Sequence, residues 1–183
     1  LKKIAQVETL ERITKNKTSL ELIQAIFPEL KNINFFSKLN PEKKLILKEL
    51  DFIFFLSLMV VDEGDNTDYF LFKFNISKKD KKRIKIIDNF YKERTQSKTF
   101  SENNINRVFY YNGKQAVIDI LNFQILKSKR IEKNLIELID HYRNKLVPKM
   151  PIGADFLMTK FNIPEGKQLG IKLKIIEEEW VKN

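Results

Sequence analysis

Apolar side chains return every three or four positions at both ends of this chain, which places them on one face of a helix. The first set is Ile4, Val7, Leu10 and Ile13, and the last is Leu169, Leu173, Ile176 and Trp180. No segment alternates convincingly with a period of two residues, so no strand is expected. The pattern therefore predicts an all-α protein, a helical bundle of about eight or nine helices with a small C-terminal two-helix tail.

A long apolar segment near the middle predicts the central helix of the core. Asn40 followed by Pro41 is a helix start, because asparagine caps well and proline suits the first helical position. From there a single helix is expected to run to about Val61. Its second half is apolar all round, and such a helix is buried. A shorter helix is expected before it, with Thr18 or Ser19 as its N-cap.

Serines and glycines locate the helices that follow. Ser77 and Ser101 each precede a helical segment and are the expected N-caps. The Asn-Gly pair at 112–113 is typical of a helix end, so the helix that begins at Ser101 is expected to stop there. Two further helices are expected at residues 114–127 and 131–146.

The C-terminal segment is expected to form a short helix, a turn and a longer helix. Gly153 opens the first helix, and Pro164 ends it because the residue before a proline is pushed out of the helical region. Gly166 begins the second helix, whose free N–H groups beside Lys167 suit an anion. Gly170 costs about 1 kcal/mol relative to alanine in a helix, so we expect a neighbouring helix or a phosphate to approach the backbone there. A two-helix cap packed on a larger body explains the same pattern without a ligand.

Composition narrows the class of protein. The chain has 183 residues, of which 43% are hydrophobic and 32% charged, as is typical of a folded soluble domain. Lys and Arg outnumber Asp and Glu by 34 to 24, giving a net charge of +10, so a nucleic acid or an acidic surface is an expected partner. Heavy use of Lys, Ile, Asn and Phe is also what A/T-rich codons produce, which leaves compositional drift as an alternative source of the charge.

The expected location is the cytoplasm. The first twenty residues are charged, and the most apolar run, residues 52–61, is too short to span a bilayer, so neither a signal peptide nor a membrane partner is expected. There is no cysteine, which excludes disulfides and thiolate metal sites. Because the chain begins with Leu1 rather than Met, we expect it to be part of a longer protein.

Several polar features allow a structural as well as a functional interpretation. Residues 62–68 lack the ligand pattern of a calcium loop and are expected to be an exposed acidic loop. The run at 78–85 carries six positive charges at a helix start, where solvated lysines and phosphate contacts are both possible. Glu93-Arg94 is expected to be a surface pair. His141, the only histidine, is also expected at the surface. No nucleophile–base pair can be named, so no catalytic or metal-ligating residue is expected.

The C-terminal segment resembles a known family. It begins with Pro-Ile-Gly and an Asp before apolar residues, continues with a Pro-x-Gly turn and Leu-Gly-x-x-Leu, and ends with acidic residues and Trp. This order resembles the tail pattern of the bacterial tRNA nucleotidyltransferases (CCA-adding enzymes) and their poly(A) polymerase relatives. The residues that carry the resemblance are Pro151, Ile152, Gly153, Asp155, Phe156, Leu157, Met158, Pro164, Gly166, Leu169, Gly170, Leu173, Glu177, Glu179 and Trp180. Phe156 stands where the family usually has leucine, and no residue separates Ile152 from Gly153.

Earlier segments are similar to the same family. Residues 71–77 before a basic helix, and residues 111–114, resemble its body domain. Residues 10–13 resemble the Ser-x-Glu-Arg-Ile motif that closes its neck domain, with Asn16 where the family usually has glutamate. The resemblance implies three parts: 1–40 as the end of a neck-like helical segment, 41–147 as a helical body, and 148–183 as an RNA-binding tail.

The resemblance implies a role in tRNA processing without chemistry of its own. The family's catalytic head carries a Gly-Ser motif and an Asp-x-Asp pair for two metal ions, and this chain has no counterpart of it. We therefore expect the chain alone to be catalytically inactive, with Mg²⁺ and nucleoside triphosphates bound only by a head supplied in cis or in trans. The chain would bind tRNA or another RNA by its shape and phosphates and position the 3′ end for that transferase head. A standalone basic RNA-binding module from a split gene and a helical protein-interaction domain remain alternatives.

The candidate RNA contacts are the C-terminal cations and the glycine that opens the last helix. A lysine or arginine can pair with a phosphate, and the glycine leaves backbone N–H groups free for one. The candidates are Arg143, Lys145, Lys149, Lys160, Gly166, Lys167, Lys172 and Lys174.

Overall fold

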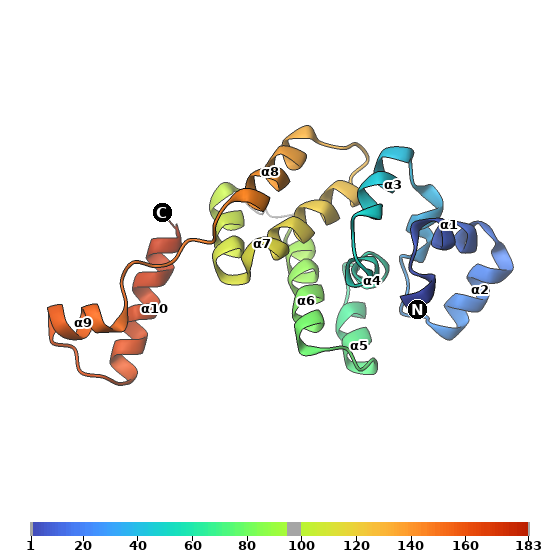
Figure 1. The fold of residues 1–183 in the computed structure, drawn as a ribbon. Coiled ribbons are helices and arrows are strands. Elements are labelled where there is room, and N and C mark those ends of the chain that lie inside the picture. The colour runs from blue at the N-terminus through green and yellow to red at the C-terminus, as the bar shows by residue number, and fades with distance from the viewer. Residues whose placement is uncertain (1, 95–99, 183) are drawn as a thin grey trace.

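This computed structural model describes residues 2–94 and 100–182, and every regular element in these two ranges is a helix (Figure 1). The expectation of an all-α fold is confirmed, with ten α-helices and two short 3-10 helices in the described part of the chain. They are η1 (Lys2–Ile4), α1 (Val7–Lys15), α2 (Lys17–Ile26), η2 (Ile33–Lys38), α3 (Pro41–Lys48), α4 (Phe52–Val60), α5 (Asn66–Lys73), α6 (Lys78–Glu93), α7 (Glu102–Lys127), α8 (Lys133–Asn144), α9 (Ala154–Phe161) and α10 (Lys167–Lys182).

Two apolar clusters make up the interior. The first joins α1 and η2 to α3, α4 and α5, and its fully buried side chains include Leu10, Phe36 and Phe54. The second lies among α6, α7 and α8. Residues 54–60 of α4 are all buried, so the apolar segment is indeed a central helix of the core. The elements before residue 40 therefore share one interior with the helices that follow (Figure 1).

The single helix expected from Pro41 to about Val61 is two helices, α3 and α4, and the sequence prediction was wrong on this point. Asp51 accounts for the break because its side chain accepts a hydrogen bond from the backbone N–H of Phe54 at 3.0 Å and so caps α4. A capping residue has extended backbone, here φ −89° and ψ 173°, so the helix cannot run through it.

The first helices also begin at other residues than predicted. The helix expected over residues 1–15 is η1 followed by α1. Asn16, rather than Thr18 or Ser19, caps α2, since its side-chain oxygen accepts a hydrogen bond from the N–H of Ser19 at 2.9 Å. Asparagine is as good an N-cap as serine, and its earlier position decides where the helix begins.

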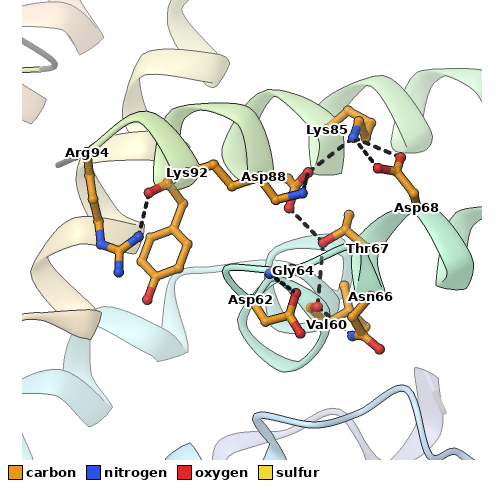
Figure 2. A network of polar contacts seen from close by, with 11 residues as sticks. Val60, Asp62, Gly64, Asn66, Thr67, Asp68, Lys85, Asp88, Lys92 and Arg94 are labelled. Carbon is orange, nitrogen blue, oxygen red and sulfur yellow. Dashed lines mark hydrogen bonds and ion pairs between the residues drawn. The ribbon is translucent and has the colours of Figure 1, made fainter. Parts of the chain in front are cut away.

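The acidic segment and the basic run are joined by the polar contacts of Figure 2. Thr67, in the segment predicted to be an exposed loop, is buried in the first turn of α5. Its hydroxyl donates to the buried carboxylate of Asp88 at 2.8 Å. Lys85 and Lys92 donate to the same carboxylate at 3.1 and 2.9 Å, and Lys85 also reaches Asp68 at 2.8 Å (Figure 2). The loop prediction was therefore wrong for the end of that segment.

Arg83, in the same basic run, connects three helices. Its guanidinium donates to both oxygens of the fully buried Asp119 on α7, at 2.5 and 2.9 Å, and it also pairs with the capping residue Asp51. Gln115 donates a further hydrogen bond to Asp119 at 2.9 Å. Removing one partner of a buried ion pair leaves an uncompensated charge, so the pair holds α6 against α7 and the start of α4. The interpretation as solvated lysines on an exposed helix therefore holds for only part of this run, such as the exposed Lys78.

The surface positions predicted for His141 and for the Glu93-Arg94 pair have different outcomes. His141 is exposed, as expected, on the outer side of α8. Arg94 is not a bare surface group, because its guanidinium lies 3.7 Å from the centre of the Tyr91 ring and pairs with Glu63. The pair with Glu63 joins the end of α6 to the loop before α5.

Two glycines of helical segments have different backbone requirements. Gly113 has φ 78° and ψ 177°, a conformation that is essentially restricted to glycine. The break predicted there is confirmed, because Gly113 interrupts the helical backbone and α7 consists of two helical segments that meet at a kink. Gly170 has open space around the position that a Cβ would take. The expected approach of a neighbouring helix is therefore wrong, and the approach of a phosphate stays a prediction.

We predict opposite effects of alanine at these two glycines. Gly113→Ala should destabilise the fold by about 1–3 kcal/mol, since the side chain meets no atom but the backbone conformation is strained. Gly170→Ala should stabilise it by about 0.5–1 kcal/mol, because alanine loses less conformational entropy in a helix. Urea unfolding followed by circular dichroism measures both, and equal effects at the two positions would contradict the assignment.

Lys127, the last residue of α7, is a partly buried cation, and no carboxylate within residues 2–94 and 100–182 forms an ion pair with it. Its Nζ lies 5.4 Å from the centre of the Phe35 ring and 5.5 Å from that of Phe123, and 3.5 Å from the carbonyl oxygen of Leu58. Burial, and secondarily the charge of Arg94, lowers the pKa of Lys127 to about 8. The folded state therefore holds this proton more weakly than the unfolded state, where a lysine pKa is about 10.4.

This difference predicts a rise in stability with pH. Between about pH 8 and 10 the unfolded chain keeps the Lys127 proton and the folded chain does not, so the contribution of Lys127 to the free energy of unfolding increases. Lys127→Met should be more stable than wild type by about 1–3 kcal/mol at pH 7, and the gain should shrink towards pH 10. A gain that does not change over this range would contradict the burial argument.

Candidate nucleic-acid interface

The last two helices form a small unit at the opposite end of the molecule from the N-terminus (Figure 1). Asn162 ends α9 in the left-handed conformation with φ 50°, and Pro164 follows it, as the sequence predicts. Gly166, with φ 146°, lies directly before α10 and is exposed. Leu157 of α9 and Leu169 of α10 are the buried side chains that hold the pair together.

Tyr110, in α7 of the body, contacts two residues of α10. The hydroxyl of Tyr110 donates a hydrogen bond to Glu177 at 2.6 Å, and its ring lies edge-on to Trp180 with centroids 5.3 Å apart. The hydrogen bond to Glu177, together with burial, raises the pKa of Tyr110 to about 12. Tyr110 therefore keeps its proton, and its role as donor, throughout the neutral pH range.

The predicted contacts on α10 fall on two sides of the helix. Lys167 and Lys174 are seven residues apart, which brings them within about 20° of each other around the helix axis. Lys172 points roughly 140–160° away from both. Lys167 and Lys172 are exposed and form no ion pair with a carboxylate in the described ranges, while Lys174 lies 3.9 Å from Glu178. Lys167, Lys174 and Gly166 therefore lie near one face, and Lys172 does not.

Lys172 instead lines an apolar groove between α9 and α10. The groove has a volume of about 430 Å³, and its other lining residues are Leu157, Phe161, Ile163, Ile175 and Ile176. Phe161 and Ile175 are 62% and 55% exposed. A search for cations in the sequence could not find this groove, because its residues come from two helices and a turn.

The two candidates nearest the body are already engaged there. Lys145 lies 5.2 Å from the centre of the Tyr142 ring and 3.3 Å from the side-chain oxygen of Asn106. Arg143 forms an ion pair with Asp140 at 3.4 Å, and both side chains are more than half exposed, so this pair is weak. Arg143 can therefore exchange its partner for a phosphate more readily than Lys145.

Two candidates, Lys149 and Lys160, stand apart from the others. Lys149 belongs to the non-helical segment between α8 and α9, where Leu146 is 84% exposed. Lys160 is on the outer side of α9. Both are exposed, and neither pairs with a carboxylate in the part of the chain that the structure describes. The eight predicted residues thus form a loose set along the tail rather than one compact cluster.

The charges of α10 run against its helix dipole. Lys167, Lys172 and Lys174 lie in its first half, with no carboxylate in the first turn, whereas Glu177, Glu178 and Glu179 lie in the second half. A cation in the first turn of a helix is unfavourable by about 0.3–1 kcal/mol, and Lys167 is in that turn. This position does not stabilise the helix, but it places a cation beside the free N–H groups of the helix start.

Two residues between α7 and α10 were not among the predicted contacts. Arg107 and Tyr111 of α7 line a cleft of about 380 Å³ against Lys174 and Glu178 of α10. Tyr111 was noted only as part of a family motif. The signal that could have found them is their spacing of four residues, which places a cation and an aromatic ring on one helix face.

No family model, curated protein or solved structure matches this chain. The likeness of its tail to the nucleotidyltransferases therefore remains a hypothesis based on the motif residues.

The described residues contain neither a candidate metal site nor a candidate membrane span. Within residues 2–94 and 100–182, no three His, Asp or Glu side chains gather as a metal site would require. Over the same residues no helix is both long and apolar enough to cross a bilayer.

The junction at Tyr110 predicts a fluorescence change, since Trp180 is the only tryptophan. Tyr110→Ala removes the hydrogen bond to Glu177 and the ring against the indole, so the emission of Trp180 should shift to longer wavelength while the helix content stays nearly constant. Tyr111→Phe is the control and should leave the emission unchanged. If Tyr110→Ala had no effect on the emission, the tail would not depend on this contact.

Proposed function

We propose that this chain binds RNA through its C-terminal tail, as the helical body and tail of a tRNA nucleotidyltransferase of the CCA-adding or poly(A) polymerase type. Its task is to hold folded RNA so that the 3′ end reaches a catalytic head that is not part of these 183 residues. Binding of Mg²⁺ and nucleoside triphosphates, and the transfer chemistry itself, belong to that head. The observation that supports the proposal best is the charge order of α10.

The charge order favours an anion as the ligand of α10. Lys167 in the first turn interacts unfavourably with the helix dipole, and a phosphate placed there interacts favourably with both the dipole and this lysine. Carboxylates elsewhere in the chain are largely used to pair with cations of the body, such as Asp88 and Asp119. The cations of the tail have few such partners, so they are free to contact phosphates.

The positions of the candidate residues indicate which of them contribute most to the proposed RNA contact. Gly166, Lys167 and Lys174 form the main contact, and Arg143, Lys149 and Lys160 extend it along the tail. Lys145 contributes less, because its charge already lies against the Tyr142 ring. Lys172, on the groove side of α10, approaches RNA only where the ligand wraps around the helix. Contacts of this kind read phosphate positions rather than base sequence.

Charge reversal on α10 should weaken RNA binding and flatten its salt dependence. Lys167→Glu/Lys174→Glu removes two phosphate contacts, so the affinity for bulk tRNA should fall about tenfold or more and the slope of log K against log salt by about 2. Glutamate at position 167, in the first turn, favours the helix. At position 174 it loses the weak pair with Glu178, so circular dichroism of the variant has to show an unchanged helix content before lost binding is assigned to lost phosphate contacts. Filter binding over a range of salt concentrations measures both quantities.

The matched control is Lys78→Glu/Lys79→Glu, which makes the same charge change at the exposed start of α6. It should alter the affinity and the slope much less. An equal loss in both variants would contradict the assignment to α10. If wild type bound no tRNA even at low salt, the proposed function would be wrong, and a protein-interaction domain using the groove at Phe161 and Ile175 would be favoured.

A further inference from the structure

Two hollows meet at the junction of the body and the tail. The larger, of about 380 Å³, lies between α7 and α10 and is lined by Arg107, Tyr111, Lys174, Glu177, Glu178 and Val181. The smaller, of about 210 Å³, lies between α6 and α7 and shares Arg107 and Tyr111 with the first. The side chains of these two residues therefore face both hollows. The larger volume is within the range of small-molecule sites in proteins.

Tyr111 is an exposed aromatic ring that is held in position. It is 43% exposed, and its ring meets that of Tyr110 edge-on at a centroid distance of 5.0 Å. Tyr110 is itself fixed by its hydrogen bond to Glu177 and its contact with Trp180. A ring that is ordered by its neighbours but open to solvent is suited to stack on a flat ligand, because little conformational entropy is lost on binding.

The groups around this ring carry both signs of charge. Arg107 precedes Tyr111 by four residues on α7, and Lys174 lies across the cleft on α10. Burial raises the pKa of Tyr111, as do the charges of Glu177 and Glu178, whereas Arg107 lowers it, so all three charged groups act on the same hydroxyl. The cations suit a phosphate. The carboxylates can accept hydrogen bonds from amino groups of a nucleobase.

We infer that the cleft between α7 and α10 binds one unpaired nucleotide of an RNA ligand, with its base stacked on Tyr111 and its phosphate near Arg107 and Lys174. This inference rests on the proposed RNA-binding function. A base inside a duplex cannot reach the ring, since its faces are covered by neighbouring base pairs. The carboxylates favour adenine, cytosine and guanine over uracil, which has no exocyclic amino group. The chain thus adds recognition of one splayed-out base to the phosphate contacts of α10.

The test compares an RNA hairpin with a blunt end and the same hairpin with a short single-stranded adenosine or uridine overhang. Wild type should bind the adenosine overhang about 5- to 150-fold more tightly than the blunt hairpin, the range typical of one stacked base. The gain with uridine should be smaller. Tyr111→Ala should lose the gain without changing the affinity for the blunt hairpin, and Tyr111→Phe should keep it.

The outcomes separate the two proposals. Equal affinities of wild type for the three RNAs, or a gain that persists in Tyr111→Ala, would overturn the stacking site while the phosphate contacts of α10 stand. Failure of wild type to bind any of the RNAs would overturn both. Unchanged Trp180 emission in Tyr111→Ala confirms that the tail is still docked, so a lost gain cannot be attributed to misfolding.

Discussion

The position of the tail relative to the body depends on Tyr110. One hydrogen bond to Glu177 and one edge-on contact with Trp180 hold α10 against α7, while the segment between α8 and α9 is non-helical and largely exposed. Since both partners lie on α10, this contact sets which face of that helix is turned to solvent. The cleft at Tyr111 lies between these two helices and therefore depends on this contact.

The body, by contrast, is held together by apolar clusters and buried ion pairs. Asp88 and Asp119 are fully buried, and each is neutralised by cations from the basic run at the start of α6. Some of the 34 Lys and Arg side chains are therefore paired within the fold, and the net charge of +10 comes from the others. The tail differs in that its exposed lysines have few carboxylate partners and that Lys167 lies in the first turn of α10, an arrangement that favours an external anion.

Local signals predicted much of this fold. The caps at Asn40, Ser77 and Ser101 are found, and so are the conformational breaks at Gly113 and Asn162. Features that depend on distant residues were not predictable. The approach of Arg83 to Asp119 spans 36 positions and that of Tyr110 to Glu177 spans 67, and neither has a local pattern. For the same reason the cations of α10 were found in the sequence, whereas the cleft that includes Arg107 was not.

The central claim is that α10 and its junction with α7 contact RNA. Ultraviolet cross-linking of the whole chain to bulk tRNA, followed by mass spectrometry of the peptides, tests it most directly. The account predicts cross-links in the peptides that contain Tyr111 and Lys167–Lys174. Cross-links confined to the start of α6, or to the N-terminal helices, would contradict it.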